Sequence, residues 1–145
     1  MSVVVAYTQS PEGVRALEAG AAEARLRGTG LHVVTVQVHE VGDSPTQARR
    51  DMTSAGALEK HLARVRGELE SADLEVATEL LHTVQGEETE QILELLPRVD
   101  AELLVVGVRR RSPVGKLVLG SVSRDLLLAA PIPVLAVKAP RERDA

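Results

Sequence analysis

The chain has 145 residues, a length typical of one globular domain, and 44% of them are hydrophobic, which suits an ordinary core. With one Tyr and no Phe or Trp, the core must be aliphatic, and nucleic-acid binding by stacking of several bases is not expected. The formal net charge of −4 also disfavours nucleic acid and anionic membranes as partners. The absence of cysteine excludes disulfides, thiol catalysis and thiolate metal sites.

The compartment is predicted from what the sequence lacks. No apolar run approaches the roughly 18 residues of a membrane span. Residues 1–5 contain no basic segment of the kind that opens a signal peptide. A chain without cysteine suits a reducing compartment. These features predict a cytoplasmic protein that does not bind membranes.

Strand-like and helix-like segments alternate along the chain. The first strand leads to Ser10 and Pro11, a pair typical of a helix N-cap followed by proline at the first helical position. Apolar spacing and glycine or proline stops delimit the other segments. A polar, arginine-rich loop is expected from Val108 to about Lys116. The predicted strands are 3–7, 31–38, 74–84, 103–106 and 132–137, and the predicted helices are 11–28, 45–71, 87–96 and 121–130.

This alternation predicts an α/β fold. The strands read as buried on both faces, which requires a parallel sheet with helices on both sides. Right-handed crossovers leave few topologies for such a sheet. Ligands of these folds bind beyond the carboxyl ends of the strands, where the winding direction reverses.

The segment from Gly107 to Ser121 has the residue types of an anion site. Gly107 follows a buried strand, and a glycine there allows another backbone or a ligand to approach closely. Gly120 and Ser121 open a helix, whose free N–H groups favour phosphate. Arginines within the segment add positive charge. A turn with an ordinary N-cap and a solvated loop would contain the same residues, so the segment alone leaves both interpretations open.

Two segments resemble motifs of the universal stress protein family. Residues 106–121 are similar to the signature Gly-x2-Gly-x9-Gly-Ser/Thr, and residues 131–137 resemble the closing Pro-Val-x-x-Val strand. The first strand and helix also resemble the opening unit, so the match covers essentially the whole chain. The resemblance implies a universal stress protein domain over residues 1–140, followed by a solvated tail at 141–145. It also implies a Rossmann-like fold of the adenine nucleotide alpha hydrolase type, with five parallel strands in the order 3-2-1-4-5.

The resemblance further implies a ligand and a role in the stress response. In ATP-binding members the nucleoside lies between the ends of strands one and four, and the loop surrounds the phosphates together with a divalent metal. We therefore expect ATP, or ADP or AMP in its place, as a regulatory ligand, with Mg²⁺ accompanying ATP. The site residues expected from the sequence are Thr8, Val36, Gly107, Arg109, Arg110, Gly120, Ser121 and Val122.

Two positions depart from the family pattern. Arg110 stands where the motif has its second glycine, and its side chain either obstructs phosphate, points outward or supplies charge to the phosphate. Thr8 replaces an acidic residue, and a hydroxyl binds a nucleoside without charge-assisted strength. These departures motivate an alternative: a dimeric stress-response interaction protein that binds no nucleotide.

The last strand and the absence of catalytic motifs complete the prediction. The resemblance implies a homodimer paired through Val134–Val137, whose edge would otherwise be an aggregation liability. The four histidines have no recognised metal-ligand spacing. No Walker lysine, nucleophile elbow or general base for water is evident, so we predict no catalytic or metal-binding residue and at most slow ATP hydrolysis.

Overall fold

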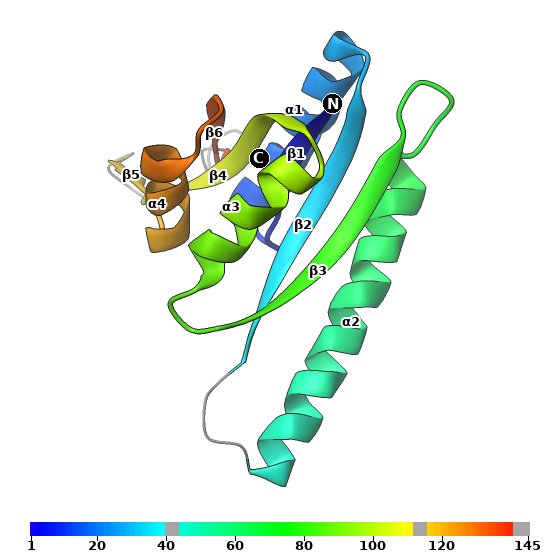
Figure 1. Cartoon of the computed structure of the whole chain (residues 1–145). Helices are drawn as coiled ribbons and strands as arrows, with labels where there is room; N and C mark the ends of the chain where they lie inside the picture. Colours follow the sequence, from blue (N-terminus) through cyan, green and yellow to red (C-terminus); the bar gives the residue numbers. More distant parts are fainter. Residues whose placement is uncertain (40–43, 112–115, 141–145) are drawn as a thin grey trace.

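The computed structural model describes residues 1–39, 44–111 and 116–140, except for the side chains of 110, 111 and 116–118. Five parallel strands form one sheet in the order β3-β2-β1-β4-β6 (Figure 1), which confirms the predicted order 3-2-1-4-5. The tail predicted at 141–145 lies outside the described residues. The strands are β1 (Ser2–Ala6), β2 (Gly30–His39), β3 (Val76–Val84), β4 (Ala101–Arg111), β5 (Lys116–Val118) and β6 (Val134–Lys138), and the helices are α1 (Pro11–Arg27), α2 (Pro45–Leu69), α3 (Glu88–Arg98) and α4 (Ser121–Ala129).

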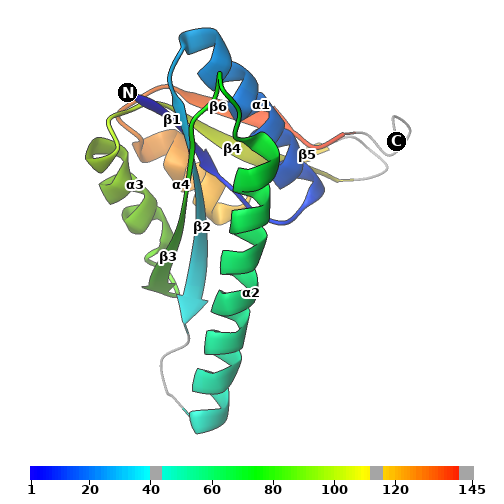
Figure 2. The same ribbon diagram turned by 90° about the vertical axis from the view of Figure 1, so that its right-hand side faces the viewer.

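Helices cover both faces of the sheet, as Figure 2 shows, with α1 and α2 on one side and α3 and α4 on the other. The alternating residues of β1 supply both cores: Val3 and Val5 pack toward α1 and α2, and Val4 packs toward α3 and α4. All three side chains are completely buried. Burial on both faces explains why these strands read as continuous apolar runs. None of the described helices is long and apolar enough to cross a membrane.

The two halves of α2 contact the sheet differently. Leu62 and Val65 in the second half are buried in the apolar core. In the first half, Asp51 Oδ2 contacts His39 Nδ1 at 3.2 Å, and His39 Nε2 lies 2.8 Å from His82 Nδ1. The N-terminal half of α2 extends beyond the lower end of the sheet in Figure 1. Apolar packing therefore anchors one half of the helix, and polar contacts anchor the other.

The arginine-rich segment after Gly107 is not the loop that we predicted. β4 continues to Arg111, pairs with β6 as far as Val108, and then pairs antiparallel with β5, so that Arg109 lies opposite Val118. The backbone hydrogen bonds of these two pairings stabilise the extended conformation, although the side chains are polar. Residues 112–115 lie outside the described residues. The prediction was wrong because strand pairing outweighed the polar composition from which we inferred a loop.

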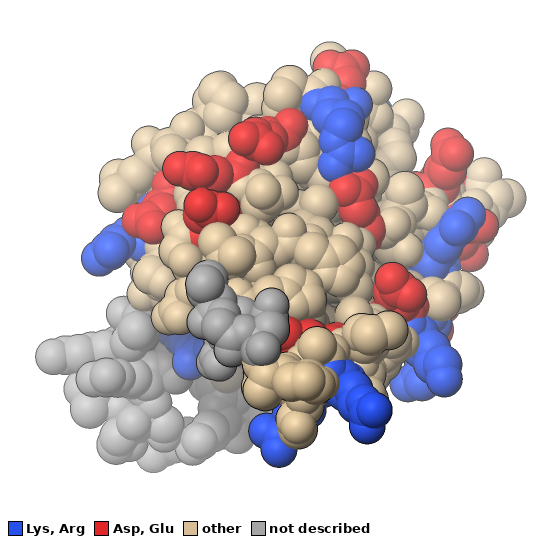
Figure 3. Space-filling model, turned by 60° about the horizontal axis from the view of Figure 1, so that its bottom comes forward, with Lys and Arg blue, Asp and Glu red and all other residues tan. Residues whose placement is uncertain are grey.

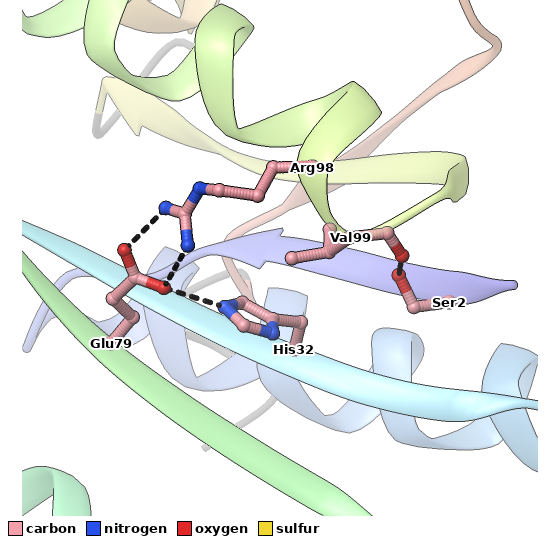
Figure 4. Close-up of polar contacts among 5 residues, drawn as sticks. All are labelled: Ser2, His32, Glu79, Arg98 and Val99. Carbon is pink, nitrogen blue, oxygen red and sulfur yellow. Dashed lines mark hydrogen bonds and ion pairs between the residues drawn. The ribbon is translucent and has the colours of Figure 1, made fainter.

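A polar cluster joins the edge of the sheet to the end of α3 (Figure 4). Arg98 Nη1 and Nη2 donate hydrogen bonds to the two carboxylate oxygens of Glu79, at 3.2 and 2.6 Å. His32 Nε2 lies 3.3 Å from Glu79 Oε1. Nearby, the Ser2 hydroxyl donates to the Val99 carbonyl at 2.8 Å. Hydrogen bonds from Arg98 and its charge, with His32 adding to them, lower the pKa of Glu79 below its ordinary value of 4.5 despite partial burial.

We expect Glu79→Gln to reduce the free energy of unfolding by about 1 kcal/mol at neutral pH, because the amide accepts weaker hydrogen bonds from Arg98. The folded chain binds fewer protons at Glu79 than the unfolded chain, since its pKa is lowered. The stabilisation that Glu79 gives the folded state is therefore present above the ordinary glutamate pKa. It is lost as the pH falls through the lower pKa that Glu79 has in the folded protein. Urea unfolding at neutral pH and at about pH 3 should show the difference between wild type and variant shrinking in acid.

Glu70→Gln is the matched control, because Glu70 forms an exposed ion pair with Arg66 on α2. Its effect should stay within about 0.5 kcal/mol at both pH values. A Glu79→Gln difference that is the same at both pH values would contradict the expected linkage.

Candidate functional site

β1 and β4 are adjacent, with Ala6 opposite Val106, but the chain leaves them toward opposite faces of the sheet. From β1 it passes to α1, which packs on the face that holds α2. From β4 it passes through β5 to α4, which packs on the face that holds α3. This is the point where the winding direction reverses, at which parallel α/β sheets bind their ligands.

Gly107 lies at the centre of this reversal point. A Cβ atom at position 107 would be 2.7 Å from the carbonyl oxygen of Glu12, in the first turn of α1. On the other side, the Ser123 hydroxyl in the first turn of α4 donates a hydrogen bond to the Gly107 carbonyl, at 3.3 Å. The first turns of α1 and α4 therefore both contact one residue of β4. The close approach that we anticipated at Gly107 is made by another part of the backbone, α1.

The four described helices differ in how their N-terminal N–H groups are satisfied. Ser10 caps α1 and Ser44 caps α2 through hydrogen bonds that their side chains accept. α3 has no such cap, but Glu88 and Glu90 place negative charge in its first turn. α4 has neither a capping side chain nor an acidic residue in its first turn. Among these four helices, α4 is therefore the one whose N-terminus is free to bind an anion.

The residues that open α4 leave room beside it. Gly120 has φ −62° and ψ 158°, a conformation open to any residue, and a Cβ atom there would meet nothing within 4 Å. Neither the backbone conformation nor packing among the described residues requires a glycine at this position. Gly120 and Ser121 are exposed, and Val122 is half-buried and packs against the core under α3 and α4. The space next to Gly120 is available to a ligand.

Thr8 and Tyr7 lie where β1 ends. The Thr8 hydroxyl is 2.8 Å from the hydroxyl of Ser10, which caps α1, so Thr8 belongs to the same polar group as the cap. Tyr7 is buried on the α2 side, its hydroxyl 2.7 Å from Nε2 of His61, and the two rings are stacked. Burial, reinforced by the charge of Glu68, raises the pKa of Tyr7 above 10.0.

Val36 occupies the carboxyl end of β2, one strand further from β4. It is half-buried and packs against the core under α3 and α4. β1 ends at Ala6, which pairs with Val34, so Val36 lies two residues beyond the end of the neighbouring strand. The Thr35 hydroxyl donates to the Tyr7 carbonyl at 3.0 Å and ties the two strands together here. Val36 thus offers an apolar surface near Thr8.

Arg109 projects toward α1. Its Nε donates a hydrogen bond to Oε1 of Glu12 at 3.1 Å. The side chain of Glu12 is 11% exposed, whereas that of Arg109 is 75% exposed. The Arg110 backbone pairs with Leu117. The sequence left several roles open for the Arg110 side chain, which lies outside the described part of the structure.

Figure 3 shows the molecule with the lower end of Figure 1 turned toward the viewer. The middle of this face contains an area without Lys, Arg, Asp or Glu, and charged side chains stand around it. Among the described residues, no group of three His, Cys, Asp or Glu side chains could hold a metal ion.

The structure gathers Thr8, Gly107, Arg109 and the first residues of α4 around the ends of β1 and β4, with Val36 on the next strand. Two further residues of this region, Glu12 and Ser123, escaped the sequence prediction. Glu12 is a buried polar residue, 8% exposed, yet in sequence it looks like an ordinary acid in the first turn of a helix. Its contact with Arg109 joins residues 97 positions apart, and no local pattern signals such a pair.

The arrangement defines a Rossmann-like α/β protein with a candidate anion site at the reversal point of its sheet. The model of the universal stress protein family matches residues 1–138. A universal stress protein of Mycolicibacterium smegmatis is 43% identical over 136 residues, which cover 94% of this chain and 96% of that protein. The chain belongs to the universal stress protein family.

Two solved structures from Archaeoglobus fulgidus extend the comparison. One is a universal stress protein with 34% identity and a TM-score of 0.71, covering 95% of this chain and 98% of that chain. The other is a universal stress protein in complex with dAMP, with 30% identity, a TM-score of 0.65 and the same coverage of both chains. Both share the Rossmann-like fold described here.

Alanine substitution should destabilise the protein at Gly107 but not at Gly120. Gly107→Ala places a Cβ against the α1 backbone, so we expect the free energy of unfolding to fall by about 1–3 kcal/mol. Gly120→Ala, whose Cβ meets nothing, should change it by no more than about 0.5 kcal/mol. Urea denaturation of both variants measures the difference. Equal effects would show that α1 does not depend on the close approach at Gly107.

Proposed function

We propose that this protein binds ATP or a related adenine nucleotide as a regulatory ligand in the stress response. The observation that carries the proposal is the N-terminus of α4, which has no cap and no acidic residue and opens beside Gly120. Because phosphate favours free N–H groups at a helix N-terminus, this position suits the phosphates of a nucleotide. The relative crystallised with dAMP, 30% identical to this chain, supports adenine as the base.

Each end of the nucleotide has suitable partners. The backbone N–H groups at the start of α4, together with the Ser121 hydroxyl, would bind phosphate oxygens. Arg109 has an exposed guanidinium near the same strand end and would add a charged donor. Thr8 would hydrogen-bond the nucleoside, and Val36 would contact the adenine. Mg²⁺ would arrive with ATP and be bound largely by its phosphates.

Purified wild-type protein should bind ATP with Mg²⁺ saturably and melt at a higher temperature with the nucleotide, because a ligand of the native state stabilises it. Gly120→Val should weaken this binding at least about tenfold, since the branched side chain fills the space beside α4. Isothermal titration calorimetry and thermal unfolding measure the two effects. Chromatography of the supernatant from denatured protein would in addition reveal any nucleotide retained during purification.

Gly56→Val is the matched control, because a Cβ at Gly56 in α2 also meets nothing within 4 Å and the position is remote from β4. It should bind ATP like the wild type. Absence of binding and of any thermal shift at about millimolar ATP with magnesium would refute the proposal. Loss of binding in both glycine variants would argue against a site at α4.

We also propose that the protein forms a homodimer through β6. This assembly would allow a role as an interaction protein even if no nucleotide binds. Within the described residues, β6 pairs with β4 on one side and with no strand on the other. The Leu104 N–H of β4 donates to the Pro133 carbonyl, and the Ala139 N–H donates to the Val108 carbonyl of β4. In a parallel pair, every second residue of a strand directs its backbone groups toward the partner strand, and the residues between them face the other way. The backbone groups of Ala136 therefore point to the outer edge, where a second β6 would pair.

Ala136→Pro tests the dimer, because proline removes an N–H that β4 does not use. We expect wild-type protein to be a dimer at about micromolar concentration and the variant to dissociate at least about tenfold more readily. Light scattering gives the mass, and circular dichroism checks the fold. Lys138→Ala, which keeps the backbone N–H at the same edge, should remain dimeric. A wild-type monomer would refute this assembly.

A further inference from the structure

We propose that Glu12 is a positioning residue, which orients Arg109 so that the terminal nitrogens of its guanidinium can bind the nucleotide phosphates. The inference rests on the proposed binding of a nucleotide at α4. It assigns a function in ligand selection to a buried carboxylate that the family signature does not include. It also gives a role to the contact that an exposed arginine makes with α1 at the end of β4.

The contact uses only one edge of the guanidinium. Glu12 Oε1 accepts from Nε of Arg109, at 3.1 Å, and neither terminal nitrogen takes part in this bond. Arg98 provides a contrast within the same chain, because both of its terminal nitrogens donate to Glu79. A guanidinium can bind an anion with two parallel hydrogen bonds only where such an edge is free. Among the described residues, no hydrogen bond engages the terminal nitrogens of Arg109, whereas both terminal nitrogens of Arg98 donate to Glu79.

Burial makes Glu12 a fixed support. Its side chain is 11% exposed, and its backbone lies against Gly107, so α1 and β4 together determine where the carboxylate stands. Its place in the first turn of α1 stabilises the negative charge through the helix dipole. The Arg109 side chain is 75% exposed and would sample many rotamers without this contact. The buried Glu12 carboxylate thus restricts the rotamers of the exposed Arg109 side chain before a ligand binds.

The strand pairing places Arg109 near the proposed phosphate position. Arg109 lies opposite Val118, and Val118 precedes Gly120, the N-cap of α4, by two residues. Gly107, two residues before Arg109 on β4, accepts the hydrogen bond from Ser123 in the first turn of α4. The start of α4 and the anchored arginine therefore flank the same end of β4, and one phosphate chain could contact both.

The carboxylate of Glu12 also repels phosphate, and the balance of the two effects decides the outcome. The positive charge of Arg109, which is paired with the Glu12 carboxylate at 3.1 Å, offsets part of the repulsion between Glu12 and the ligand. Ordering a long arginine side chain during binding, by contrast, costs affinity whatever the salt concentration. We infer that the ordering effect is larger. The orientation of Arg109 by Glu12 should therefore strengthen the binding of ligands with several phosphates. It should not affect the binding of adenosine, which has no phosphate.

The test compares the affinities of ATP and adenosine for wild type, Glu12→Ala and Glu12→Gln. Glu12→Ala should weaken ATP binding about three- to tenfold and leave adenosine binding unchanged. Glu12→Gln keeps an acceptor for Arg109 Nε and should retain most of the ATP affinity. Arg109→Ala should weaken ATP binding similarly, and Glu12→Ala should have no further effect in that background. Melting temperatures check that each variant is folded.

Three results would overturn the inference. Tighter ATP binding by both Glu12 variants would show that Glu12 competes with phosphate for Arg109. Unchanged ATP binding by Glu12→Ala would show that the anchor is irrelevant to the ligand. Equal weakening of ATP and adenosine binding would indicate a structural role in α1.

Tripolyphosphate, which lacks adenine, separates this inference from the proposed function. If the wild type binds tripolyphosphate but no adenine nucleotide, the proposed function fails, and the same Glu12 variants then test the positioning with tripolyphosphate. If the wild type binds neither, both fail. If ATP binds and the Glu12 variants behave like wild type, only the positioning role fails.

Discussion

The first turn of α1 lies so close to β4 that position 107 accommodates no Cβ atom without a shift of the backbone. This approach fixes the distance between α1 and the strand from which the candidate site extends. From α4 on the other face, the Ser123 hydroxyl donates to the carbonyl of the same residue, so both helices are placed against the backbone of β4 at position 107. The placement of Glu12, and through it that of Arg109, follows from this contact. A family glycine expected to touch phosphate thus also determines how the helices are arranged around the candidate site.

The two helices that meet at Gly107 use their N-termini for different purposes. Ser10 satisfies the first turn of α1, which is closed to an anion and instead carries a buried carboxylate. The first turn of α4 is uncapped and open. One helix therefore gives structural support, and the other remains available for binding. The free N–H groups at a helix N-terminus are often capped by a side chain. At α4 they have no such cap, and this is the physical basis of the proposed site.

Local patterns predicted the parallel α/β class and the residue types of an anion site, whereas the family resemblance implied the strand order and the nucleoside contacts. The buried strands, the Ser10–Pro11 helix start and the sequence from Gly107 to Ser121 are properties of short segments. The structure confirms the strand order that the resemblance to the universal stress protein family implied. The contact between Arg109 and Glu12 depends on how β4 passes α1, which no segment encodes alone. The pairing of β4 with β5 was missed for the same reason, because hydrogen bonds between strands outweighed the polar composition.

The division of α2 into an apolar half and a polar half has a consequence for its dynamics. Leu62 and Val65 are buried in the core, so their half should open only when the whole domain unfolds. The half near Asp51 contacts the sheet through imidazole rings that water can reach. Local unfolding should therefore begin at Pro45 and stop near Leu62, and amide hydrogen exchange would record it as a gradient of protection along one continuous helix.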